Sequence, residues 1–384
     1  MNDKPVQRAP RAFSFRRSGP GCLIAAATLV VAAVTAVALL LTARLLRTAH
    51  DGDYVLMQQV LHEFLESMEE TAAMRAELVS DMPDVHAALG ARDRPKLLAV
   101  CKQMYEAQEK KYDVDQAQFH VPPGVSFLRL HNPDKFGDDQ TSYRPMLVNV
   151  HQTKTLRRGL AITKSGPVVS AIVPVTDGQG NFLGSFEVGV DLAPEFDEIK
   201  EHYGLEAAVF FDEKVLRELA PDIDPELMSS NNRVGKFMRI HATHPELSAA
   251  LVTDRDLEIT EPKNYQRDVA GTAWGVQLVP LYNYAKKQVG VAALAANFGE
   301  DETLAGRARI WQLLAAFVAI IASVGAILVV IRGTLLRPLA ALNDRLAALA
   351  GGDDSQPAPP MDHHCQELRD LADSYERLRS GKGS

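Results

Sequence analysis

Hydrophobic positions concentrate in two uncharged runs, residues 18–43 and 310–331. Each run is long enough to cross a hydrocarbon core of about 30 Å as a helix that rises 1.5 Å per residue. The first run is longer than the roughly 7–15 apolar residues of a signal peptide, so we expect an uncleaved anchor instead of a leader. The pattern therefore predicts a protein that crosses a membrane twice.

Basic residues around the first run predict the orientation of the chain. Those before it are Lys4, Arg8, Arg11, Arg16 and Arg17, whereas those close after it are Arg44 and Arg47. Because cytoplasmic flanks carry the excess of Lys and Arg, the N-terminus is expected in the cytoplasm, and a second span returns the C-terminus there. We therefore predict a bacterial inner-membrane protein with a cytoplasmic tail at 1–17, an extracytoplasmic region at 44–309 and a cytoplasmic region at 332–384.

Between the two spans, helical periodicity is followed by alternation. Apolar residues at helical spacing predict a long amphipathic helix that continues from the first span, and then a second helix from about 95 to 111. From residue 119 onward, the pattern changes to short runs that are typical of strands. The predicted strands are 126–130, 159–163, 168–175, 184–191, 207–211, 265–270, 274–280 and 289–297. The turn 177–181, Asp-Gly-Gln-Gly-Asn, is typical of a β-hairpin.

The strand-rich region contains an internal repeat. Pro280 and Gly290 lie 106 residues after Pro174 and Gly184, and apolar positions around them match at the same offset. Such a repeat predicts two tandem α+β modules, a membrane-distal one at about 81–195 and a membrane-proximal one at about 200–300.

Residues 332–384 predict a pair of short helices. A helix that begins at Arg337-Pro338 and another near residue 368 each carry apolar residues at heptad spacing: Leu339, Leu342, Leu346 and Leu349, then Leu368, Leu371, Tyr375 and Leu378. Because each seam is too short to be stable alone, we expect two chains to pair into a four-helix bundle, which makes the protein a homodimer. After Arg379 only Ser-Gly-Lys-Gly-Ser follow, so either an output domain has been removed or the chain signals through a separate cytoplasmic partner.

Charge and motifs exclude several functions. A net charge of −8 without a basic stripe argues against nucleic-acid binding. No nucleophile elbow, metal-ligand spacing or carboxylate pair indicates an enzyme, so no catalytic residue, cofactor or metal is expected, and His363-His364-Cys365 is too small a cluster to predict a metal site.

Two stretches carry family resemblances. The Arg-Pro-Leu start, the Leu-x-x-Leu repeats and Gly351-Gly352-Asp353 make residues 332–379 similar to a HAMP relay. The segments 119–123, 126–131, 136–139 and 184–189 resemble the double Cache sensory domains of chemoreceptors and sensor kinases, closest to type 3. The resemblance implies an α+β fold with two tandem PAS-like modules on a long N-terminal helix, flanked by the two membrane helices. It departs from the family pattern at 159–164 and at Ser170.

The resemblance also implies that a small molecule binds against the sheet of a module. Alternation along 126–131 predicts that Arg129 shares one face with its neighbours two positions away. A guanidinium can hold a carboxylate through two hydrogen bonds, so the expected ligand is a carboxylate or an amino acid. The candidate ligand-binding residues are Phe127, Arg129, His131, Tyr143, Arg144, Lys164 and Glu187. The alternative is that Arg129 pairs with Glu187 and is only structural.

These features predict a non-catalytic transmembrane receptor that senses a small molecule outside the membrane and relays a conformational change through the HAMP-like helices. The alternative is a membrane-anchored binding or scaffold module that transmits no signal.

Overall fold

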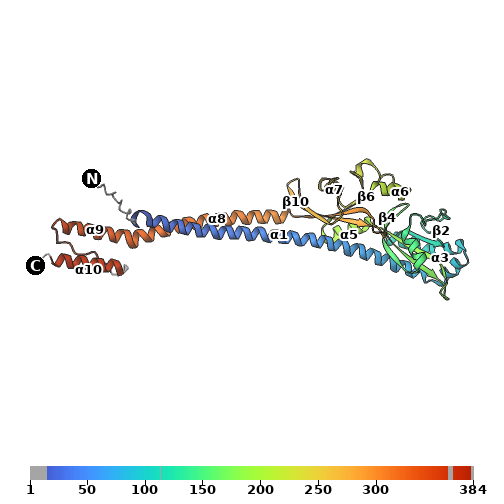
Figure 1. Cartoon of the computed structure of the whole chain (residues 1–384), viewed down its shortest axis with the longest axis horizontal. Coiled ribbons are helices and arrows are strands. Elements are labelled where there is room, and N and C mark those ends of the chain that lie inside the picture. The colour runs from blue at the N-terminus through green and yellow to red at the C-terminus, as the bar shows by residue number, and fades with distance from the viewer. Residues whose placement is uncertain (1–14, 113, 362–365, 382–384) are drawn as a thin grey trace, which may run out of the picture. The chain divides into compact units, whose positions relative to one another are not determined.

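The computed structural model describes residues 15–112, 114–361 and 366–381, and Figure 1 shows their arrangement into helices and strands. The predicted tail up to residue 14 and His363-His364-Cys365 lie outside the described residues. The chain divides into two compact units, one of them Arg47–Glu302 and the other formed by the segments on either side of it.

Two helices carry the apolar runs. α1 (Phe15–Ser80) contains the first and α8 (Gly299–Ile331) the second, and both are long and apolar enough to cross a membrane. Their most apolar windows are 0% and 6% buried within the chain, whereas the core helix of a soluble protein would be mostly covered. Thr42 and Gln312 join the two helices through a 3.0 Å hydrogen bond.

The Arg47–Glu302 unit contains two antiparallel sheets. Sheet A has the strand order β2-β1-β5-β4-β3 and sheet B the order β7-β8-β6-β11-β10-β9. The strands of sheet A are β1 (Val114–Val121), β2 (Val125–Arg129), β3 (Arg157–Thr163), β4 (Gly166–Thr176) and β5 (Phe182–Asp191). Those of sheet B are β6 (Glu206–Asp212), β7 (Arg233–Val234), β8 (Phe237–Ala242), β9 (Lys263–Val269), β10 (Thr272–Tyr282) and β11 (Gln288–Asn297).

The predicted repeat is confirmed by strand order and register. Apart from the short β7, sheet B repeats the order of sheet A, and the hairpin β10–β11 corresponds to β4–β5. Val175 pairs with Gly184, and Leu281 pairs with Gly290 at the same offset. A Cβ atom on either glycine would overlap a carbonyl oxygen of the adjacent strand, at His120 in sheet A and at Phe210 in sheet B. Close backbone approach therefore explains why both copies retain the glycine.

Both modules pack on the C-terminal half of α1, along which Figure 1 shows the two sheets. The Tyr54 hydroxyl donates a 3.0 Å hydrogen bond to the carbonyl of Tyr265 in sheet B, and Arg158 in sheet A lies 3.5 Å from Glu69. One hydrophobic cluster joins α1, both sheets and the helices α2 (Pro83–Gly90), α3 (Arg94–Tyr112) and α5 (Ala193–Tyr203). The predicted α+β fold with two modules on a long N-terminal helix is confirmed.

The remaining helices are short. α4 (Pro145–Thr153) packs on sheet A, and α6 (Glu213–Leu219), the 3₁₀ turn η1 (Ser230–Asn232) and α7 (Pro245–Leu251) belong to the second module. After α8, the π-helical segment η2 (Arg332–Leu336) leads into α9 (Arg337–Ala350), and α10 (Gln366–Gly381) follows.

Three elements differ from the sequence expectation. β1 begins at Val114, earlier than the predicted change of pattern near residue 119, because its start reads as polar. The segment 212–264 contains the strand β8, and α4 separates β2 from β3. Pro145 at the first turn of α4 is typical of a helix start, but the helix is only nine residues long.

Candidate ligand-binding site

One face of sheet A is polar although it is buried. On β1 and β5, alternation places Phe119 and Phe186 in the main hydrophobic cluster, and the residues between them point to the other face. That face carries Gln118, His120, Ser185 and Glu187, all at most 5% exposed. Buried polar groups are costly unless they are hydrogen-bonded, so their concentration on one face marks a functional surface.

The equivalent face of sheet B is apolar. At the positions of Gln118, His120, Ser185 and Glu187, register places Ala208, Phe210, Val291 and Ala293. All four lie in one hydrophobic cluster. A polar ligand on this face of sheet B would have to displace that core, so the polar face favours the first module for the candidate site.

A cavity of about 490 Å³ lies over the polar face of sheet A. It lies between the strands β1 and β2, the loop that connects β2 to α4, and the turn between β3 and β4. Its charged lining consists of Arg129, Lys135, Arg144 and Lys164 with Asp134, Asp138 and Asp222. Such a cavity suits a small polar molecule.

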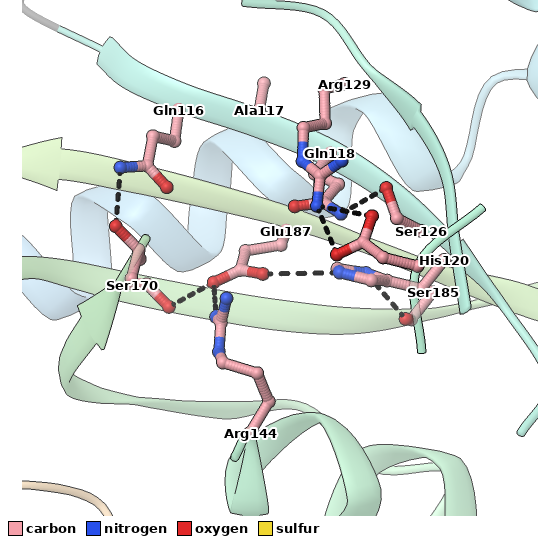
Figure 2. Close-up of polar contacts among 12 residues, drawn as sticks. Gln116, Ala117, Gln118, His120, Ser126, Arg129, Arg144, Ser170, Ser185 and Glu187 are labelled. Carbon is pink, nitrogen blue, oxygen red and sulfur yellow. Dashed lines mark hydrogen bonds and ion pairs between the residues drawn. The ribbon is translucent and has the colours of Figure 1, made fainter. Parts of the chain in front are cut away.

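Beneath the cavity, Glu187 is the centre of a buried network (Figure 2). Its Oε1 atom accepts hydrogen bonds from Arg144 and, at 2.9 Å, from Ser170, while Oε2 lies 3.6 Å from Nε2 of His120. Arg144 reaches Glu187 from the residue that precedes α4, whereas the other members stand on the strands of the sheet. The ion pair therefore fastens the loop between β2 and α4, here called the covering segment, to the floor of the site.

The histidines of this floor are neutral at physiological pH. Burial, and then the nearby positive charge of Arg144, hold the pKa of His120 well below its usual value. Burial and the charge of Lys154 lower the pKa of His151 to about 4, and its Nε2 lies 2.9 Å from the hydroxyl of Ser185. Arg144 and Glu187 are thus the charged members of the network.

At the side of the cavity, Asp138 joins two cations. Nη2 of Arg129 lies 2.9 Å from its carboxylate and Nζ of Lys164 lies 3.0 Å from it. Burial alone would raise the pKa of Asp138, but the hydrogen bonds from Arg129 and Lys164 outweigh burial and hold it well below its ordinary value. Tyr143 lies beside this group, and burial followed by the Asp138 charge raises its pKa to about 12.

The cavity brings together most of the predicted ligand-binding residues. Those that line it are Arg129, His131, Tyr143, Arg144 and Lys164. Glu187 lies under Arg144 instead of in the wall, and Phe127 packs against the main hydrophobic cluster. A register shift between β1 and β2 explains the position of Phe127, because it brings Ser126 onto the polar face, where its hydroxyl accepts a 2.7 Å hydrogen bond from Gln118.

The alternative that Arg129 pairs with Glu187 is wrong. The strand β1 lies between β2, which carries Arg129, and β5, which carries Glu187. Gln118 on β1 is the register partner of both residues and so separates them. Arg129 instead pairs with Asp138 on the loop that follows its own strand, and the partner of Glu187 is Arg144.

Sequence reasoning did not select four charged residues of the cavity, namely Asp134, Lys135, Asp138 and Asp222. Asp138 and Lys135 lie on the loop after β2, close enough in sequence to Arg129 that charge alternation could have nominated them. Asp222 contacts the side chain of Lys135, which lies 87 positions earlier in the sequence, and no local pattern indicates such a pairing.

Comparison with known families gives one match, which covers most of the Arg47–Glu302 unit. Residues 56–298 match the model of the dCache_3 family, described as a double sensory domain of two-component sensor kinase. No curated protein matches the chain significantly.

Two solved sensory domains are distantly similar to the chain. The sensor domain of the histidine kinase DctB of Vibrio cholerae shares 12% identity at a TM-score of 0.37, over 64% of this chain and 98% of that one. The ligand-binding domain of the Campylobacter jejuni chemoreceptor Tlp3, solved with L-valine, shares 11% identity at a TM-score of 0.32, over 70% of this chain and 95% of that one.

Proposed function

The chain belongs to the dCache_3 family of double sensory domains, and from that premise we propose that it is a transmembrane receptor for a small polar molecule bound in the first module. Sensory domains of this kind are non-catalytic ligand-binding modules. The observation that carries the proposal is the cavity of about 490 Å³ over the buried polar face of sheet A.

The charges of the cavity support a ligand with a carboxylate, such as an organic acid or an amino acid. Within the described part of the chain, Arg129 bonds through its two Nη atoms and Arg144 through Nη2, so each guanidinium retains N–H groups that can face a ligand. Fixed guanidinium groups at the wall of a cavity bind carboxylates with directional, charge-assisted hydrogen bonds.

A thermal-shift screen of the full chain in detergent tests this function. Amino acids, organic acids and amines are added one at a time, and a compound present at 100 times its dissociation constant is expected to stabilise the chain by about 2.7 kcal/mol. For a unit of this size that corresponds to a rise in Tm of roughly 5–10 °C. Arg129→Ala is expected to weaken binding of that compound at least about tenfold, because charge-assisted hydrogen bonds are lost.

Arg158→Ala is the matched control for this screen. Arg158 lies on β3 of the same sheet and pairs with Glu69 and Glu70, outside the cavity lining. The control should retain the full shift. If Arg129→Ala folds and keeps the shift as well, the ligand does not bind where we propose.

Two membrane helices on either side of the sensory unit support a two-pass receptor, which we place in the bacterial inner membrane with both termini in the cytoplasm. In this proposal the sensory unit lies in the periplasm and α9 and α10 form a HAMP-type relay to a cytoplasmic signalling partner. Ligand binding would favour one of two packings of the dimer by its differential affinity for them.

The apolar seams of α9 and α10 support pairing with a second chain. On each helix, residues seven positions apart are buried: Leu342 and Leu349 on α9, and Leu368 and Tyr375 on α10. Leu342, Leu349 and Tyr375 share one hydrophobic cluster between the helices. The other leucines of the two heptad seams are exposed, namely Leu339, Leu346, Leu371 and Leu378. An intrachain contact therefore uses half of each heptad seam, and the other half is available to a second copy.

Cysteine chemistry at Leu346 tests the dimer and the topology together. In cells that express a chain without its native cysteines, Leu346→Cys is expected to form a disulfide-linked dimer under a mild oxidant, because the side chain is 36% exposed on the proposed interface. A membrane-impermeant thiol reagent outside spheroplasts should leave it unlabelled.

Leu342→Cys is the matched control, since Leu342 is 1% exposed and faces its own chain. It should remain monomeric under the same oxidant. Equal crosslinking at both positions would argue against the proposed seam, and labelling of position 346 from outside would place α9 on the wrong side of the membrane.

A further inference from the structure

Five residues close a ring of polar contacts at the cavity. Arg129 donates from Nη1 to the carbonyl of Lys135 at 2.7 Å, and Nζ of Lys135 lies 3.1 Å from the Asp222 carboxylate. The amide of Asp222 donates to the carbonyl of Lys164 at 2.8 Å, and Lys164 and Arg129 both bind Asp138. All five residues line the cavity, so the ring surrounds the space that a ligand would occupy.

Asp222 is the one member of this ring that belongs to the second module. It follows α6, whereas the other four lie on β2, on the loop after β2 and on the β3–β4 turn of the first module. Neighbouring contacts hold the two modules together here. The amide of Tyr284 donates to the carbonyl of Leu160 on β3 at 3.3 Å, and Ile223 lies beside Gly166 at the start of β4.

The side-chain link between Lys135 and Asp222 is the weakest in the ring. The two side chains are 59% and 46% exposed, and ion pairs in such a position contribute little to stability. Arg129, by contrast, has a side chain that is 9% exposed, and it shares Asp138 with Lys164. An anion that enters the cavity therefore displaces Asp222 from Lys135 more easily than it displaces Asp138 from its two cations.

We propose that the Asp222 carboxylate occupies the place of a ligand carboxylate on Lys135 in the ligand-free receptor, and that ligand binding releases it. Asp222 then acts as a competing anion that sets the affinity of the site, and its release reports occupancy of the first module directly to the second. This inference rests on the proposed function, because it requires an anionic ligand in the same cavity. By linkage, ligand binding weakens the contact between Asp222 and Lys135 by the same factor by which that contact weakens ligand binding.

Hydrogen exchange on the ligand-free full chain tests the resting ring. The backbone amide of residue 222 is bonded to Lys164, and the Lys135 ion pair holds that segment in place. Asp222→Asn is expected to speed exchange of this amide up to about fivefold, the equivalent of about 1 kcal/mol. Lys135→Gln should have the same effect, and the double variant should add nothing further.

Glu258→Gln provides the control for exchange. Glu258 forms a similarly exposed pair with Lys236 in the second module, with side chains 65% and 59% exposed. Its replacement should leave exchange at residue 222 unchanged. If Asp222→Asn has no larger effect than this control, the ring does not hold the two modules and the inference fails.

Titration with succinate, a small dicarboxylate, tests the displacement step. Removal of the competing anion in Asp222→Asn is expected to tighten succinate binding by up to about fivefold relative to the natural chain. A residue that only stabilised the fold would leave the affinity unchanged or weaken it. Unchanged or weaker binding to Asp222→Asn would therefore overturn the displacement.

This titration distinguishes failure of the carboxylate site from failure of the competing role of Asp222. If the natural chain and Asp222→Asn bind succinate with equal affinity and Arg129→Ala binds it more weakly, the carboxylate site stands and the competing role of Asp222 is wrong. If Arg129→Ala also binds succinate as tightly as the natural chain, the carboxylate does not lie on Arg129, and the proposed site and the displacement are both overturned.

Discussion

Replacement of Arg144 by methionine is expected to lower the free energy of unfolding by about 3–5 kcal/mol, because it leaves the Glu187 carboxylate buried without its cation. Glu187 is 3% exposed and Arg144 is 5% exposed, so water cannot substitute for the lost partner. Thermal unfolding of the full chain in detergent should show a fall in Tm of about 10 °C. Removal of both charges, in Arg144→Met with Glu187→Gln, should recover much of that loss.

Lys200→Met serves as the comparison for Arg144→Met. Lys200 pairs with Glu206 at 3.1 Å, but its side chain is 41% exposed, so its loss should change the unfolding free energy by less than about 1 kcal/mol. If Arg144→Met were no more destabilising than Lys200→Met, the covering segment would not depend on this ion pair.

Gly184→Ala and Gly290→Ala are expected to destabilise the chain by similar amounts, each about 3 kcal/mol, at the upper end of the range for overpacking. In both positions the added methyl group would overlap the carbonyl oxygen of the adjacent strand, at His120 or at Phe210. Backbone that is paired on both sides cannot move away without losing ladder hydrogen bonds. Urea unfolding of the two single variants measures the effect.

Gly178→Ala is the control for these glycines. Gly178 lies in the hairpin turn between β4 and β5, with no atom within 4 Å of the position of an added Cβ. Its replacement should be neutral or slightly stabilising. If Gly184→Ala is as harmless as Gly178→Ala while Gly290→Ala is not, the two hairpins are not equivalent and the repeat has diverged in its backbone.

Much of the fold follows from local patterns. The strands of the hairpins β4–β5 and β10–β11 are runs rich in Val, Leu and Ala, and the Pro and Gly positions of the first hairpin recur in the second. The start of β1 was not predicted because Asp115, Gln116 and Gln118 read as a polar loop. Gln116 and Gln118 are polar because they line the candidate site, so the same property that marks the site conceals the strand.

The candidate site could be predicted only in part. Alternation on β2 identified Arg129, and charge chemistry identified Arg144 and Lys164, all of which line the cavity. The displacement of Phe127 depends on a bulge in the β1–β2 pairing, which no sequence pattern marks. The pairing of Arg144 with Glu187, and that of Lys135 with Asp222, depends on how distant segments fold together.

The contrast between the polar face of sheet A and the apolar face of sheet B suggests how this duplicated architecture can evolve. On the proposed function, substitutions among Gln118, Ser170 and Glu187 would change what the first copy recognises without disturbing the interior of the second, where Ala208, Val276 and Ala293 occupy the matching places. One copy would thereby be free to acquire new specificities, while the other, whose last strand leads into α8, would keep its apolar interior.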